Sequence, residues 1–169
     1  NKPGDPTHTF SAFTASVLQL RPESTGHLEL RSSGPDEHPA IHPNYLATTK
    51  DCDTIVAGIK VARAICGTEP VKSLIIGEHS PGPFVGTNDD EAILEWTRNT
   101  ATTIYHPAGT CKMGSDRMAV VNDRLQVHGI EGLRVADASI MPAITSGNTN
   151  APAIMIGEKA SDMVLKEAL

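Results

Sequence analysis

The sequence predicts an α+β fold, in which a small antiparallel sheet and three helices are joined by long loops. Two stretches near the start have the composition and spacing of strands, and three later stretches have the apolar spacing of helices. Prolines and glycines separate these stretches. With 169 residues, of which 39% are hydrophobic and 20% charged, the chain has the size and composition of a globular domain with a core.

The predicted strands are residues 13–20 and 27–31. The first (FTASVLQL) is rich in β-branched and apolar residues, and the second (HLELR) alternates, so we expect it to be half buried through Leu28 and Leu30. A turn rich in proline and glycine separates them, and we expect the two strands to pair antiparallel. Residues 34–45 are polar and proline-rich and are predicted to form a long ordered loop.

Two helices are predicted in the middle of the chain. Residues 51–66 place apolar side chains on one face, and Gly67 follows as a C-terminal cap. Residues 88–98 form the second helix, with Asn88 as its cap and an acidic first turn. The loop over residues 80–86 contains two prolines and two glycines and is a candidate for the mouth of a site.

The last part of the chain predicts a short strand over residues 133–136 and a final helix over residues 149–169. Thr149 or Asn150 can cap this helix, and Pro152 lies in its first turn, where a missing N–H is tolerated.

Composition excludes several classes of function. A formal charge of −6 argues against nucleic acid as a partner. The three cysteines form no CxxC pair, which argues against a zinc site or a disulfide framework and favours a reducing, cytoplasmic compartment. The sequence has no apolar run of transmembrane length, and association with a membrane surface stays an open alternative.

His106 lies in a segment, YHPAGTCKMG (residues 105–114), in which proline and glycine restrict the backbone. A histidine in such a turn has two interpretations. One is a structural hydrogen bond, and the other is proton transfer at neutral pH.

The start of the final helix also has two interpretations. Asn148, Thr149 and Asn150 supply more polar side chains than one cap needs. A helix N-terminus stabilises an anion, and a reduced flavin, a phosphate or a carboxylate would be served equally well. Asp137 follows the predicted short strand and is either a cap or a polar contact to a cofactor.

No metal site is predicted. His38 and His42 are four residues apart, but Pro39 and Pro43 exclude the helix that would align them as ligands. The sequence also lacks the GxSxG turn of a serine hydrolase, and it places no charged group where it would activate Cys111 as a nucleophile.

Several separated blocks resemble the C-terminal part of the glucose–methanol–choline (GMC) oxidoreductases, which are FAD-dependent alcohol oxidases and dehydrogenases. The resemblance covers nearly the whole chain. Its blocks are LRPES (20–24), PNYL (43–46), YHPAGTCKMG (105–114), GLRVADASIMP (132–142), GNTNAP (147–152) and IMIGEKA (154–160). The family's Gly-rich dinucleotide fingerprint, GxGxxG, does not occur in this sequence.

The resemblance implies roles for individual residues. His106 matches the family's active-site histidine, and Asn148 matches a second active-site position that is His or Asn in the family. Contacts with FAD are implied for Tyr105, Asp137, Ala138, Thr149, Asn150 and Ala151.

The resemblance also implies the organisation of the chain and its partners. Residues 1–104 would be part of the substrate-binding domain, and residues 105–169 would carry the active-site segment and the strand and helix that return to an FAD-binding α/β domain. The partners would be a small alcohol and the N-terminal FAD-binding portion of the same protein. The alternative is a non-catalytic module of a split or truncated relative that only binds a partner.

Overall fold

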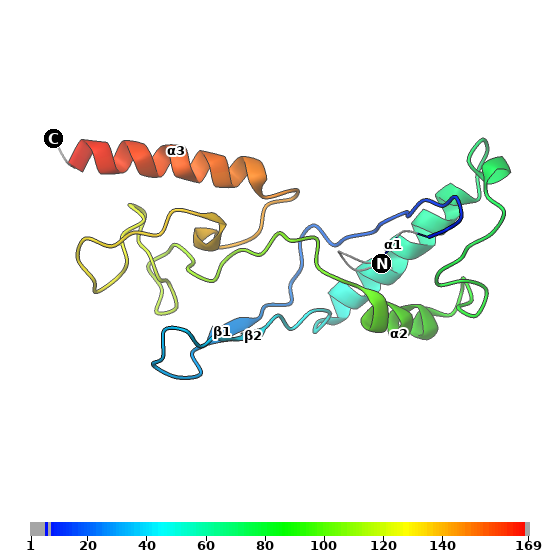
Figure 1. Ribbon diagram of the computed structural model, residues 1–169, viewed down its shortest axis with the longest axis horizontal. Coiled ribbons are helices and arrows are strands. Elements are labelled where there is room, and N and C mark those ends of the chain that lie inside the picture. Colours follow the sequence, from blue (N-terminus) through cyan, green and yellow to red (C-terminus); the bar gives the residue numbers. More distant parts are fainter. Residues whose placement is uncertain (1–5, 7, 168–169) are drawn as a thin grey trace. The chain divides into compact units, whose positions relative to one another are not determined.

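A computed structural model of the chain describes residue 6 and residues 8–167 (Figure 1). The described residues form two compact units, each assembled from two separate stretches of chain. One unit combines the stretch ending at Thr25 with Asn44–Thr103, and the other combines Gly26–Pro43 with the stretch beginning at Ile104. The segment Gly26–Pro43 therefore belongs with the C-terminal stretch and not with its neighbours in sequence.

The first unit is built on helices α1 (Thr49–Cys66) and α2 (Asp90–Thr100), which confirm the two predicted central helices. Their packed faces bury Cys52, Val56, Ile93 and Thr97. Gly67 ends α1 as predicted, because its N–H bonds back to carbonyls of the last turn. The cap of α2 is Asp89, whose side chain accepts from the Ala92 N–H, so the prediction of Asn88 as the cap is wrong. A short 3₁₀ helix, Lys72–Leu74, lies between them.

Residues 13–20 form no strand, so this prediction and its pairing with residues 27–31 are wrong. The segment instead lies along α1. Gly58 leaves a gap on that helix, and the Val17 side chain fills it so closely that an added Cβ would meet Val17 Cγ1 at 2.3 Å. A segment with the composition of a strand therefore packs against a helix, and not against another strand.

The second unit contains a two-stranded antiparallel sheet of β1 (His27–Glu29) and β2 (Ala40–His42). The second strand lies in the segment predicted as a loop. It is only three residues long and is flanked by Pro39 and Pro43. Proline is tolerated at strand ends, but two prolines so close together predict a loop and not a strand. Leu30 is 85% exposed and Leu28 46% exposed, so the predicted half-burial through these residues is wrong.

The core of the second unit lies between loop residues and helix α3 (Asn150–Glu167). This helix confirms the predicted final helix, although residues 168 and 169 lie outside the described part of the chain. The buried residues are Val121, Leu125, Ile140, Met141, Ile156 and Ala160. The predicted strand at residues 133–136 is wrong, because only one isolated bridge, Gln126 to Arg134, forms there. A 3₁₀ helix, Ala138–Ile140, follows it. Among the described residues, no helix is both long and apolar enough to cross a bilayer.

Candidate functional site

His106 is half buried and follows a residue with an uncommon backbone conformation. Tyr105 has a φ of 64°, in the left-handed region that non-glycine residues rarely adopt. Three residues after His106, Gly109 has a φ of 87°, and an added Cβ would lie 3.2 Å from the Met141 carbonyl oxygen. The loop therefore needs glycine at position 109, and the backbone on both sides of His106 is held in a defined shape.

Two backbone hydrogen bonds attach this loop to the 3₁₀ helix at 138–140. The Cys111 N–H donates to the Ser139 carbonyl at 2.9 Å, and the Met113 N–H donates to the Ile140 carbonyl at 2.7 Å. Ile140 and Met141 belong to the core that also contains Ile156 of α3. The histidine loop and the start of the last helix are therefore positioned by the same core.

Thr149 precedes α3 and is 7% exposed. Its carbonyl accepts the Ala153 N–H at 2.9 Å, which places it at the cap position. A capping hydroxyl commonly accepts from the N–H of the second or third helical residue, but the third residue here is Pro152, which has no N–H. The Thr149 hydroxyl lies instead 3.0 Å from Nδ1 of His106.

This contact makes the two imidazole nitrogens of His106 inequivalent. With Nδ1 engaged by Thr149, the neutral tautomer that donates from Nδ1–H leaves a lone pair on Nε2. Within the described part of the chain, Nε2 makes no hydrogen bond. The arrangement can therefore hold the ring in one orientation and present Nε2 as a proton acceptor.

The residues around Thr149 are open to solvent. Asn148, Asn150 and Ala151 are all exposed, and the described residues show no hydrogen bond between Asn148 and His106. The first N–H groups of a helix lack acceptors within the helix, and the helix dipole makes this end positive. The start of α3 can therefore donate hydrogen bonds to an anionic or carbonyl-bearing group.

Asp137 has a local structural role. Its carboxylate accepts the Ser139 N–H at 2.7 Å and caps the 3₁₀ helix, as its structural interpretation predicts. Hydrogen bonds from Ser139 hold the pKa of Asp137 below its ordinary value, so the side chain is an anion near neutral pH. Ala138 packs partly buried against the core. A contact from either residue to a cofactor stays a prediction.

The structure thus brings His106 into contact with Thr149 and connects the His106 loop to the segment after Asp137. Both His106 and Thr149 are predicted site residues, but their contact is not predicted from the sequence. A signal was present, since proline three residues after Thr149 removes a donor that would compete for its hydroxyl.

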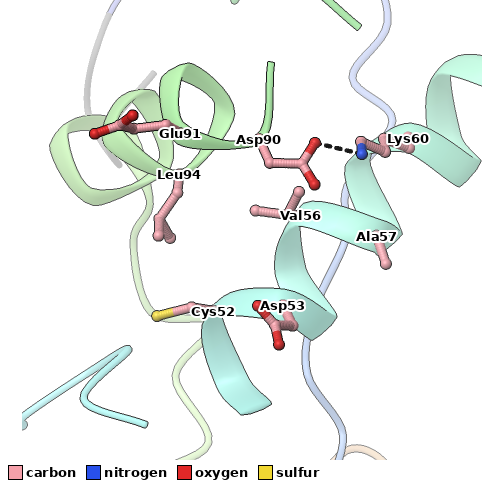
Figure 2. A pocket seen from close by; sticks show the side chains of 8 residues that line it. All are labelled: Cys52, Asp53, Val56, Ala57, Lys60, Asp90, Glu91 and Leu94. Atoms are coloured by element: carbon pink, nitrogen blue, oxygen red, sulfur yellow. Dashed lines mark ion pairs between the residues drawn. The ribbon is translucent and has the colours of Figure 1, made fainter. Parts of the chain in front are cut away.

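Two pockets lie elsewhere. The first, of about 340 Å³, lies between α1 and α2, where Figure 2 shows Val56 and Leu94 pointing toward each other beside the Lys60–Asp90 ion pair. The second, of about 620 Å³, is lined by loop residues 126–134 and the end of α3. Neither pocket is lined by His106 or Asn148.

Comparison with known proteins gives a consistent result. Residues 22–157 match the family model described as GMC oxidoreductase. The chain is 45% identical over 155 residues to an alcohol dehydrogenase (acceptor) of Pseudomonas putida, covering 92% of this chain and 28% of the relative. It is 47% identical over 152 residues to an oxygen-dependent choline dehydrogenase of Cronobacter sakazakii, covering 90% of this chain and 27% of the relative.

Solved structures of FAD-dependent oxidoreductases are also similar to this chain. An FAD-dependent oxidoreductase from Chaetomium thermophilum superposes with a TM-score of 0.80 at 30% identity, covering 88% of this chain and 26% of that one. The chain thus spans little more than a quarter of the length of these relatives.

Proposed function

The chain belongs to the GMC oxidoreductase family, whose C-terminal part it matches, and on that premise we propose that it supplies the alcohol-binding side of an FAD-dependent active site. The reaction would be removal of a hydride from a CH–OH group of a small alcohol. The observation that carries the proposal is the contact between His106 Nδ1 and Thr149 Oγ1, because it joins a proton acceptor to a helix N-terminus.

The residues at the start of α3 have the donors that FAD would need. Backbone N–H groups in the first turn and the exposed amides of Asn148 and Asn150 suit the oxygen and nitrogen atoms of a flavin ring. We assign Tyr105, Thr149, Asn150 and Ala151 to the ring, and Asp137 and Ala138 to the side of the ribityl phosphate. When bound, FAD supplies the acceptor for the hydride that leaves the alcohol carbon.

His106 accepts the proton of the alcohol hydroxyl at Nε2. Thr149 holds the ring through Nδ1, so the lone pair on Nε2 keeps a constant direction. Removing this proton makes the alcohol a better hydride donor. A positioned general base contributes a factor of roughly 10²–10⁴ in rate.

Asn148 donates a hydrogen bond from its amide to the alcohol oxygen. It directly precedes Thr149, so the residue that binds the alcohol and the residue that orients the base are neighbours in the chain. Hydrogen bonds to the oxygen keep the hydroxyl directed at His106.

The rest of the active site would come from the N-terminal FAD-binding portion of the protein. The chain covers 28% of the length of its alcohol dehydrogenase relative, and large apolar side chains on it are strongly exposed, among them Ile154, Leu165, Phe84 and Leu30. We assign residues 1–104 to the substrate-binding domain, and residues 105–169 to the active-site segment and the return to the FAD-binding domain. We also assign a cytoplasmic location, since Cys52, Cys66 and Cys111 are free thiols.

The test compares His106→Ala with the wild-type protein containing its FAD-binding portion, assayed on a panel of primary aliphatic and aromatic alcohols. Turnover should fall by roughly 10²–10⁴ while the flavin absorbance per protein stays unchanged. The matched control is His128→Ala, because His128 belongs to the same unit but its Nε2 lies 3.1 Å from the Gly114 carbonyl oxygen.

Two results would contradict the proposal. Equal losses of turnover and flavin in His106→Ala would make His106 a structural residue. A wild-type protein that carries no flavin, although complete, would favour the alternative of a non-catalytic, partner-binding module.

A further inference from the structure

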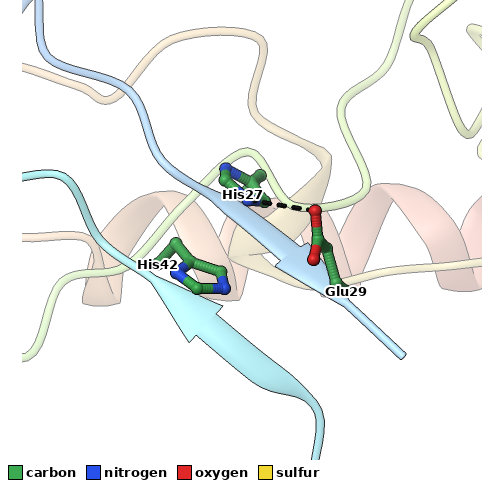
Figure 3. A group of neighbouring side chains, drawn as sticks. All are labelled: His27, Glu29 and His42. Atoms are coloured by element: carbon green, nitrogen blue, oxygen red, sulfur yellow. Dashed lines mark ion pairs between the residues drawn. The ribbon is translucent and has the colours of Figure 1, made fainter. Parts of the chain in front are cut away.

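The hairpin β1–β2 places two histidines and a glutamate on one face. His27 lies directly opposite His42 in the antiparallel register, and Glu29 lies two residues after His27, so all three side chains project from the same side of the sheet. Figure 3 shows the three side chains gathered over the two strands. One ligand atom from each residue lies within 4.8 Å of the others.

The side chains are already close to a chelating arrangement. His27 Nε2 lies 3.3 Å from Glu29 Oε1, and the rings of His27 and His42 stack with centroids 4.6 Å apart. Zinc bonds of about 2.0–2.1 Å in a tetrahedral site separate neighbouring ligand atoms by about 3.3 Å. The His27–Glu29 pair therefore has the required spacing. His42 needs only a side-chain rotation, and it is exposed and free to make it.

We propose that His27, Glu29 and His42 bind one divalent transition-metal ion, with zinc as the ion that suits them best. Two imidazoles and one carboxylate are a common set of protein ligands for zinc, and water would complete the tetrahedron. A bound ion also links β1 to β2 and closes the loop between them. The spacing of His38 and His42 in the sequence predicts no metal site, whereas the strand register places His42 opposite His27.

This site is separate from the proposed alcohol site, and no residue is shared between them. Its effect would be structural, because a hairpin of two three-residue strands is marginal by itself and an ion that binds the folded form stabilises it. Leu28 and Ile41, the central cross-strand pair, project from the opposite face and do not compete for the ion.

The test is calorimetric titration of the complete protein with zinc chloride at about pH 7.5, where imidazole is largely neutral. Wild type should bind one equivalent that is lost or strongly weakened in His42→Ala and Glu29→Gln. Removing an outer-shell partner already costs roughly 10–100-fold in zinc affinity, so removing a ligand should cost at least that much. Because the three side chains are exposed, the variants should fold normally, which circular dichroism checks.

The controls separate this site from other histidines. His38→Ala removes an exposed histidine from the same hairpin loop and should bind zinc as wild type does. His8→Ala tests the other close pair, since the rings of His8 and His79 lie 5.2 Å apart. Zinc-edge X-ray absorption of the loaded protein should show two imidazoles. No binding by wild type, full binding by His42→Ala, loss of binding in His8→Ala, or sulfur ligation would each overturn the proposal.

Discussion

The hydroxyl of Thr149 lies 3.0 Å from Nδ1 of His106, which connects a residue at the start of helix α3 to a histidine 43 residues earlier in the chain. Both partners belong to the same compact unit, and Thr149 is buried. A partly buried hydrogen bond restrains the ring more than a fully exposed one. The relationship therefore gives the His106 ring a preferred orientation.

Thr149→Val keeps the shape of the side chain and removes the hydroxyl. We expect turnover to fall about tenfold, because a half-buried ring nitrogen left without a partner costs about 1–3 kcal/mol. Thr149→Ser retains the hydroxyl and should restore turnover. An unchanged turnover in Thr149→Val would show that the contact only stabilises the fold.

Asn148→Ala tests whether its amide binds the alcohol oxygen. We expect a loss of about 10² in kcat/KM, the size found when a hydrogen-bond donor to a reacting oxygen is removed. Asn148→His should keep most of the activity, because a histidine can supply the same donor. Asn99→Ala is the matched control, since the Asn99 amide donates to the Glu95 carbonyl within α2. Equal activity in Asn148→Ala and Asn99→Ala would remove Asn148 from the site.

Gly58→Ala should destabilise the first unit although alanine favours helices. The added methyl would lie 2.3 Å from Val17 Cγ1, and a stiff β-branched side chain cannot withdraw easily. Overpacking of this kind costs about 1–3 kcal/mol, which exceeds the gain of about 1 kcal/mol in helix propensity.

Two comparisons check the Gly58 prediction by thermal unfolding. Val17→Ala should rescue Gly58→Ala in a double-mutant cycle, because it removes the methyl groups that clash. Gly157→Ala in α3 meets no atom within 4 Å and should therefore be stabilising. A stabilising Gly58→Ala would show that the segment around Val17 does not pack on α1.

Local patterns predicted the helices well because each carries its own signals. For α1, the spacing of apolar residues such as Cys52 and Val56 predicts the helix, and Gly67 predicts where it ends. These signals all lie within one short stretch of sequence. Strand pairing carries no such local signal. Nothing within residues 13–20 indicates that their partner is Gly58 of a helix and not the strand that begins at His27.

The proposed alcohol site and the proposed metal site were also only partly predictable from local sequence patterns. His106 and Thr149 were each identifiable as polar residues in special positions, but their contact depends on a core formed by Ile140, Met141 and Ile156. The pairing of His27 with His42 depends on a three-residue strand hidden between two prolines. In both cases the residue types were visible in the sequence, and their proximity was a property of the tertiary fold.

Asp51 should make the stability of the first unit depend on pH. It is 2% exposed, and its carboxylate accepts hydrogen bonds from the Ser24 hydroxyl at 2.5 Å and from the backbone N–H groups of Ser24 at 2.8 Å and Glu23 at 3.0 Å. Burial alone would raise the pKa of Asp51, but these hydrogen bonds outweigh it and hold the pKa well below its usual range. The carboxylate thereby ties the LRPES segment to the first turn of α1.

The sign of the pH effect follows from the lowered pKa. The unfolded chain takes up a proton on Asp51 near pH ~3.9, whereas the folded chain resists it to lower pH. The stabilisation is therefore complete above about pH 5 and declines as the pH falls through about 4 toward the folded pKa. Asp51→Asn should cost roughly 2 kcal/mol near neutral pH, since it replaces a charged acceptor by a neutral amide.

Urea unfolding of wild type and Asp51→Asn between neutral and acid pH measures their difference in the free energy of unfolding. This difference should become smaller below about pH 4. Asp53→Asn, an exposed carboxylate on the same helix, is the control and should show a small effect at every pH. A gap between wild type and Asp51→Asn that stays constant down to acid pH would mean that the charge on Asp51 does not hold the segment. The Asp51 carboxyl would then stabilise the fold equally well whether it is protonated or charged.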